Sequence, residues 1–200
     1  MTTASLIGDS QAEGLLPYIQ EHMEARGFAI IGAATHVGWK TGRFVREQPA
    51  TALSRLGADV VLVVLGGNDI ALTADSRAEL ASDIRQFLVQ IRSSSSPHII
   101  WIGPAHSTDP DTSRRHEGVA AVQRAILPAL GVEWHDGEPM TDDLGHAADG
   151  VHFPRTSLMR WADRIDRSLF TNEHSTRWVG AVALLAAAAG VAGVVWVYWR

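Results

Sequence analysis

Short apolar segments alternate along the chain with longer segments whose apolar residues recur at helical spacing. The clearest strand signal is residues 59–65, which are β-branched and apolar on both faces, as in a central parallel strand. Residues 75–92 form the clearest amphipathic helix. Further strands are predicted at 4–7, 28–31, 98–102 and 132–134, and further helices at 11–26, 44–56, 112–130 and 153–169. This alternation predicts an α/β fold with a five-stranded parallel sheet and helices on both faces.

Two prolines bear on the predicted helices. We expect Pro49 in the first turn of the helix at 44–56, where a missing N–H is tolerated. Pro128 is expected near the end of the helix at 112–130. A polar loop is predicted at 136–150.

The C-terminal segment has a different pattern, because no residue from 178 to 199 is charged. A helix rises about 1.5 Å per residue, so this segment would cover roughly the 30 Å of a bilayer core. Trp178 and Trp199 lie at its two ends, and Arg177 and Arg200 flank it, as membrane interfaces favour. We predict a transmembrane helix, and a buried globular helix or an oligomer contact is the alternative.

The predicted organisation is therefore a globular domain at 1–171, a linker at 172–177 and a membrane helix at 178–199. The N-terminus does not resemble a signal peptide, so we expect the globular domain to be cytoplasmic and anchored by its tail. Basic residues before the helix, such as Arg177, agree with the positive-inside rule. Small residues four apart, Ala189 and Gly193, suggest self-association of this helix.

Composition narrows the possible partners and cofactors. The chain has 200 residues, a formal net charge of −5 and no long run of one sign, so a nucleic-acid partner is not expected. It has no cysteine, which excludes disulfides and thiolate metal sites. No cofactor or metal is expected.

Three polar motifs follow the ends of predicted strands, where parallel sheets bind ligands. In the first motif, Gly-Asp-Ser at residues 8–10, Ser10 lies at the start of a predicted helix. It is either a nucleophile or an ordinary N-cap of that helix. Residues 66–69 (Gly-Gly-Asn-Asp) offer Asn68 as a hydrogen-bond donor, or a simple turn. Asp149 stands three residues before His152, so it can orient that imidazole as a base, or merely cap a helix.

Taken together, these motifs supply a nucleophile, an oxyanion donor and an oriented base. Here the chain resembles the SGNH hydrolases, also called GDSL-type esterases and lipases. The blocks that match are Gly8-Asp9-Ser10, Gly66-Gly67-Asn68-Asp69 and Asp149-Gly150-Val151-His152, and the resemblance covers about residues 4–170. It implies a three-layer α/β/α sandwich.

The resemblance also implies roles for individual residues. Ser10 would be the nucleophile, His152 the general base and Asp149 its orienter. The oxyanion hole would consist of the N–H groups of Ser10 and Gly38 and the amide of Asn68, and Gly32 and Gly42 are rivals for the glycine. Many family members have leucine where this chain has Gln11, and we expect that difference to have little effect on the chemistry.

The resemblance thus predicts hydrolysis of a small-molecule or lipid ester, as a carboxylic or thio ester. A catalytically inactive binding or structural protein on the same fold is the alternative. Trp39, as an apolar wall, and His106, after the strand at 98–102, are candidates to line the substrate site. The alternatives are that Trp39 packs under its own loop and that His106 is an ordinary loop residue.

The sequence disfavours two other kinds of site, a metal site and a phosphate-binding loop. His146, Asp149 and His152 have metal-ligand spacing, but glycines at 145 and 150 oppose the helix that would align them. The segment 32–41 superficially resembles a phosphate-binding loop, but Trp39 interrupts the required Gly-Lys pair.

Overall fold

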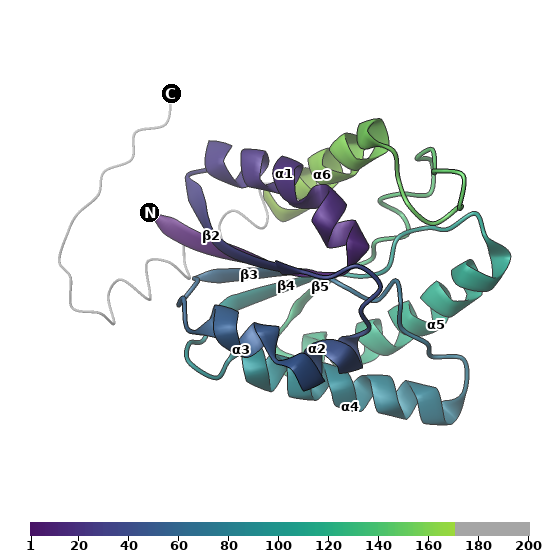
Figure 1. The fold of residues 1–200 in the computed structure, drawn as a ribbon, viewed down its shortest axis with the longest axis horizontal. Coiled ribbons are helices and arrows are strands. Elements are labelled where there is room, and N and C mark those ends of the chain that lie inside the picture. The colour runs from purple at the N-terminus through teal and green to yellow at the C-terminus, as the bar shows by residue number, and fades with distance from the viewer. Residues whose placement is uncertain (171–200) are drawn as a thin grey trace. The chain divides into compact units, whose positions relative to one another are not determined.

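The computed structural model describes residues 1–170 and has a five-stranded sheet at its centre (Figure 1). Its strands are β1 (Thr2–Gly8), β2 (Phe28–Thr35), β3 (Val60–Val64), β4 (His98–Ile102) and β5 (Glu133–His135). The strand order is β2-β1-β3-β4-β5, and every neighbouring pair is parallel. The predicted α/β class and five-stranded parallel sheet are confirmed.

Helices cover both faces of the sheet. They are α1 (Ser10–Ala25), α2 (Thr41–Glu47), α3 (Pro49–Ser54), α4 (Ala74–Ile91), α5 (Pro110–Ile126), the 3₁₀ turn η1 (Pro128–Leu130) and α6 (Arg155–Phe170). In Figure 1, α1 and the start of α6 lie on one face, and α2 to α5 lie on the other. Gly14 of α1 lies against Leu158 of α6, where a Cβ on the glycine would come 3.1 Å from the leucine. Residues 1–164 form one compact unit.

The helix predicted at 44–56 is wrong in one respect, because the structure contains two helices there. Gln48 adopts a left-handed conformation with φ of 56°, which ends α2. Pro49 then starts α3 at a position where its missing N–H breaks no helical bond. Pro128 similarly separates α5 from a short 3₁₀ turn. In both cases the proline begins a new segment.

The core on the α2–α5 side includes a continuous row of aromatic rings. Trp101 of β4 packs edge-on against Phe87 of α4, with ring centroids 5.7 Å apart. Phe87 packs against Phe44 of α2 at 5.9 Å, and Phe44 against Trp39 at 5.0 Å. Because Trp39 belongs to the loop after β2, this row of rings joins that loop to the centre of the core.

Parallel pairing brings the loops after the first three strands together. Gly8, the last residue of β1, is in register with Thr35 of β2 and with Val64 of β3. The backbone continues these ladders past the strand ends, because Asp9 N–H donates to Val64 O and His36 N–H donates to Gly8 O. The motifs after β1, β2 and β3 therefore leave the sheet at one edge.

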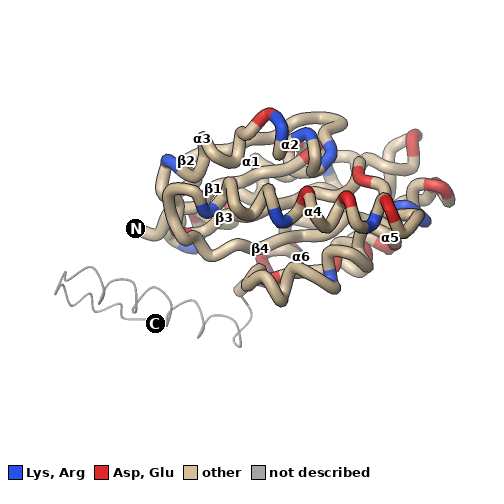
Figure 2. Tube along the Cα trace, turned by 90° about the horizontal axis from the view of Figure 1, so that it is seen from below, with Lys and Arg blue, Asp and Glu red and all other residues tan. Residues whose placement is uncertain are grey.

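Basic and acidic residues are interspersed along the surface helices α4 and α5 (Figure 2).

Over residues 1–170, no helix is both long enough and apolar enough to cross a bilayer. The predicted linker at 172–177 and membrane helix at 178–199 lie outside the described residues.

Candidate active site

Ser10 is the first residue of α1, but it does not act as the helix cap. Asp9 is the N-cap, and its Oδ1 accepts a hydrogen bond of 3.0 Å from the Gln11 N–H. The Ser10 hydroxyl is therefore not used in capping, and its Oγ lies 3.0 Å from Nε2 of His152. The structure thus brings together two side chains that are 142 positions apart in the sequence.

Asp149 holds the other side of the same imidazole. Its Oδ2 lies 2.7 Å from His152 Nδ1, and its Oδ1 accepts the N–H groups of Val151 and His152, each at 2.9 Å. The His152 N–H, the His152 ring and the Val151 N–H all lower the pKa of Asp149. An ionised Asp149 accepts from Nδ1–H, which leaves Nε2 free to accept a proton from Ser10.

The conformation of the loop that carries His152 is fixed by a left-handed glycine and by hydrogen bonds to its backbone carbonyls. Gly150 has φ of +69°, and a Cβ there would lie 2.6 Å from Thr108 Oγ1, so glycine is required. The Gly150 carbonyl accepts the Thr108 N–H at 3.0 Å and the Ser107 hydroxyl at 2.9 Å. Ala147 N–H donates to His152 O at 2.8 Å. The two bonds to the Gly150 carbonyl anchor the His152 loop to the loop after β4, and the Ala147 bond closes the His152 loop on itself.

Asn68 and Gly38 come close together at the same edge. Gly66 turns the chain at the end of β3 with φ of +135°, a conformation that favours glycine. The Asn68 side-chain amide then donates to Trp39 O at 3.3 Å, next to Gly38. Gly38 has φ of +73°, and a Cβ there would meet nothing within 4 Å, so its backbone faces open space.

The rival glycines have other surroundings. A Cβ at Gly32 would meet the side chains of Leu53 and Leu56, and a Cβ at Gly42 would clash with the Asp83 carboxylate. Both glycines therefore face neighbouring side chains rather than open space. Of the three candidates, only Gly38 lies in the turn beside Asn68 in the part of the chain that the structure describes.

Trp39 lies in this turn, but other side chains cover much of its ring. His36 stacks on it at a centroid distance of 3.9 Å and an interplanar angle of 13°. The Arg43 guanidinium lies 4.5 Å from its ring centroid, and Phe44 packs on its edge. The indole is half-buried, so contact with a substrate is limited to what these three side chains leave uncovered.

His106 contacts the polar loop at 136–150. Its ring packs edge-on to His146, its Nδ1 lies 3.6 Å from Glu138, and its carbonyl contacts His146 Nε2 at 3.0 Å. Within residues 1–170, no hydrogen bond or ring contact joins His106 to Ser10, His152 or Asp149. Among residues 1–170, His106 thus contacts the 136–150 loop, whereas Ser10, His152 and Asp149 contact one another.

His146, Asp149 and His152, which have metal-ligand spacing in the sequence, do not converge on one point. The ring of His146 contacts the His106 carbonyl, whereas Asp149 contacts His152. Across residues 1–170, no group of three or more His, Asp or Glu side chains is arranged to hold a metal ion.

Two buried carboxyl groups support the loops around the site. Burial raises the pKa of Asp9 to about 6, although the Gln11 N–H partly offsets it, and the nearby Asp69 charge raises it further. Burial also raises the pKa of Asp69 to about 6, although its hydrogen bonds from Thr41 N–H and Oγ1 act in the opposite direction. Asp69 thereby joins the segment after β3 to the start of α2.

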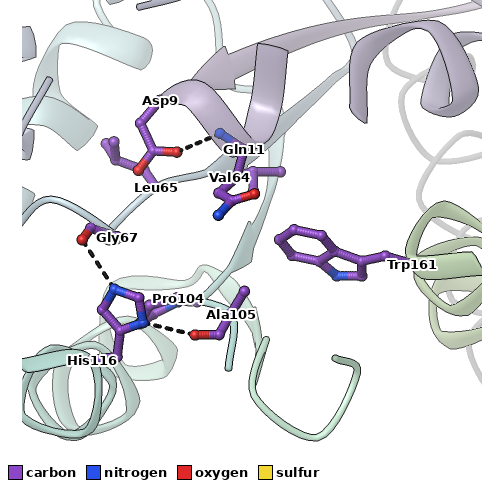
Figure 3. Close-up of a pocket in the computed structure, with 10 residues that line it drawn as sticks. Asp9, Gln11, Val64, Leu65, Gly67, Pro104, Ala105, His116 and Trp161 are labelled. Atoms are coloured by element: carbon purple, nitrogen blue, oxygen red, sulfur yellow. Dashed lines mark hydrogen bonds between the residues drawn. The ribbon is translucent and has the colours of Figure 1, made fainter. Parts of the chain in front are cut away.

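A small cavity lies behind Asp9 and Gln11 (Figure 3). Its volume of about 10 Å³ leaves room for roughly one water molecule. On its far side His116 lies between two carbonyl oxygens, 2.7 Å from Ala105 O and 3.0 Å from Gly67 O. Burial lowers the pKa of His116, so the neutral ring has one N–H to donate to these two acceptors.

Sequence reasoning missed three supporting residues. Ser107 and His116 bond to backbone carbonyls of loops that lie far away in the sequence. Gln11, from which little was expected, donates through Nε2 to the Val151 carbonyl at 2.9 Å. No local sequence signal identifies such contacts, because each joins segments that only the folded sheet brings together.

Three structures of known proteins resemble this fold. A lipase/acylhydrolase from Enterococcus faecalis is 21% identical, with a TM-score of 0.66 over 84% of this chain and 95% of that one. An acetylxylan esterase from Geobacillus stearothermophilus is 16% identical, with a TM-score of 0.68 over 86% and 95%. A carbohydrate esterase family 3 protein from Talaromyces cellulolyticus is 20% identical, with a TM-score of 0.65 over 84% and 96%. At these identities the likeness establishes the fold.

The family assignment comes from the sequence itself. No curated protein sequence matches this chain. The model of the GDSL-like Lipase/Acylhydrolase family matches residues 6–156, which include the Ser10, Asn68, Asp149 and His152 motifs. The chain therefore belongs to the GDSL-like lipase/acylhydrolase family, whose SGNH members its sequence motifs resemble.

Proposed function

We propose that this chain is a serine hydrolase that cleaves carboxylic or thio esters, with Ser10 as nucleophile. The observation that carries the proposal is the continuous contact from Ser10 Oγ to His152 Nε2 at 3.0 Å and from His152 Nδ1 to Asp149 Oδ2 at 2.7 Å. This arrangement supplies a nucleophile, its base and the group that orients the base.

In the proposed acylation step, Ser10 Oγ attacks the acyl carbon while His152 Nε2 takes its proton. Asp149 stabilises the imidazolium that forms. The oxyanion receives hydrogen bonds from the Ser10 N–H, the Gly38 N–H and the Asn68 amide. The Ser10 N–H suits this role because the first residue of a helix has no partner for its N–H within that helix. His152 then gives its proton to the leaving oxygen or sulfur.

Deacylation repeats these roles with water as the nucleophile. The side chains of His152 and Asp149 are 47% and 50% exposed, so water reaches the base directly. His152 removes a proton from that water, the tetrahedral intermediate collapses, and the carboxylic acid leaves as Ser10 Oγ regains its proton.

The substrate we propose is an ester with a short acyl group. One of the similar structures is an acetylxylan esterase, and the acetyl group in that name supports a small acyl group. The alcohol part, in a small molecule or a lipid, would lie at the open edge of the site.

Labelling with a fluorophosphonate probe tests the function. Wild-type protein is expected to be labelled at neutral pH, Ser10→Ala is not, and Ser113→Ala on α5 serves as the matched control. An inactive binding protein on the same fold would give no Ser10-dependent labelling. Hydrolysis of nitrophenyl esters of increasing chain length then measures the acyl preference, which we expect to be highest for acetate.

We further propose that residues 178–199 anchor the protein in a membrane, with the catalytic domain in the cytoplasm. The support is the uncharged sequence with tryptophans at both ends and arginines before it. Deleting residues after Thr176 is expected to move the protein to the soluble fraction. Cross-linking of the segment in detergent tests the proposed self-association, which fails if the segment stays monomeric.

A further inference from the structure

Two consecutive residues of α1 contact two consecutive residues of the His152 loop. Ser10 Oγ lies 3.0 Å from His152 Nε2, and Gln11 Nε2 donates to the carbonyl of Val151 at 2.9 Å. The Gln11 contact therefore lies beside the proposed proton-transfer contact and joins the same two segments. Because the backbone of a helix is rigid, a change in the position of the Gln11 contact also changes the distance between Ser10 Oγ and His152 Nε2.

Gln11 is buried in this position, with 7% of the residue exposed. Burying a side-chain amide is unfavourable unless its hydrogen-bonding groups find partners. Val151 O supplies that partner, so the bond is favoured over an alternative rotamer that would leave the amide unpaired. Leucine, which many family members have here, has no side-chain N–H to donate to this carbonyl.

The Gln11 bond complements the other restraints on the loop. The Gly150 carbonyl is held by Ser107 and Thr108, which fixes the loop to the segment after β4. Asp149 holds the two N–H groups that follow. Gln11 instead fixes the Val151–His152 peptide to the helix that carries Ser10, so it bears directly on the distance between nucleophile and base.

We propose that Gln11 is a positioning residue that holds His152 at the correct distance and angle from Ser10 through the Val151 carbonyl. The inference rests on the proposed hydrolase function. Without the Gln11 amide, the Val151–His152 peptide keeps its restraints toward the loop after β4 but loses its direct restraint toward α1. The imidazole then samples positions less suited to accept the Ser10 proton.

The first test replaces Gln11 with methionine, which has a similar length and no N–H donor. Gln20→Met is the matched control, because Gln20 is an exposed residue of the same helix that bonds to Glu24. With full-length chain, we expect kcat for nitrophenyl acetate and the fluorophosphonate labelling rate to fall roughly three- to tenfold in Gln11→Met, as loss of one hydrogen bond predicts. KM should change little, the melting temperature should fall by only a few degrees because one hydrogen bond is lost, and Gln20→Met should match wild type.

A double-mutant cycle separates positioning from a general structural role. If Gln11 acts through His152, Gln11→Met has no further effect on kcat once His152→Ala has removed the imidazole. If the Gln11 substitution instead lowers kcat by the same factor in both backgrounds, the positioning role is refuted. It is also refuted if Gln11→Met alone has wild-type kcat and labelling.

The experiments distinguish failure of the positioning role of Gln11 from failure of the proposed hydrolase function. If Ser10 of the wild-type protein is neither labelled nor needed for ester hydrolysis, the proposed function fails, and the role of Gln11 fails with it. If wild type is labelled at Ser10 and Gln11→Met is labelled equally fast, only the positioning role fails.

Discussion

The buried carboxyl group of Asp9, next to the proposed nucleophile, is expected to make stability depend on pH. Burial raises its pKa from the ordinary 3.8 to about 6. Between these two values the native state binds more protons than the unfolded state, so stability falls as pH rises. The destabilisation is absent below about pH 4 and complete above the native pKa.

The size of the effect follows from the pKa change. A tenfold change in an acid dissociation constant corresponds to about 1.4 kcal/mol, so a rise from 3.8 to about 6 corresponds to about 3 kcal/mol. Asp9→Asn removes the ionisation and keeps an oxygen to accept the Gln11 N–H. We therefore expect Asp9→Asn to gain stability relative to wild type by up to about 3 kcal/mol between pH 4 and pH 7.5.

Urea unfolding followed by tryptophan fluorescence measures this difference at several pH values. Subtracting the free energy of unfolding of wild type from that of Asp9→Asn at each pH largely cancels the titration of other groups. The nearby Asp69 is coupled to Asp9 and modifies the shape of the curve without reversing its sign. A difference that stays constant from pH 4 to pH 7.5 would refute the raised pKa of Asp9.

Three further outcomes are expected. Asp149→Asn should lower kcat for nitrophenyl acetate roughly 10³-fold at neutral pH, because the amide does not stabilise the His152 imidazolium; an unchanged kcat would exclude this role. Gly150→Ala should lower the free energy of unfolding by at least about 1–2 kcal/mol in urea, given its left-handed backbone and the approach of its Cβ to Thr108; wild-type stability would contradict this. Phe87→Ala should lower it by roughly 3–5 kcal/mol because the ring is fully buried, and a loss below about 1 kcal/mol would mean that the core refills the space.

The sheet was predictable from the sequence because its strands carry a local signal. The apolar β-branched run at 59–65 became β3, and the strand predicted at 98–102 was found with the same bounds. Because neighbouring parallel strands end at the same edge of a sheet, Asn68 and Ser10 could be predicted to lie at one edge before any side-chain contact was known.

The supporting contacts were not predictable, for physical reasons. Gln11 was expected to matter little because its sequence position suggests only a helix residue, whereas its amide reaches Val151 across 140 positions. The break at Gln48 was missed because left-handed glutamine is uncommon, and Pro49 alone fits either the first turn of one long helix or the start of a second. Such features are decided by tertiary packing rather than by local preference.

The row of aromatic rings from Trp101 to Trp39 has a consequence for protein engineering. The turn that holds Gly38 looks like an ordinary surface loop, yet Trp39 within it is packed through Phe44 and Phe87 onto Trp101 of β4. A mutant library confined to this turn would therefore vary residues whose positions are already set from inside the protein. Changing the shape of this turn requires varying Phe44 and Phe87 in the same library.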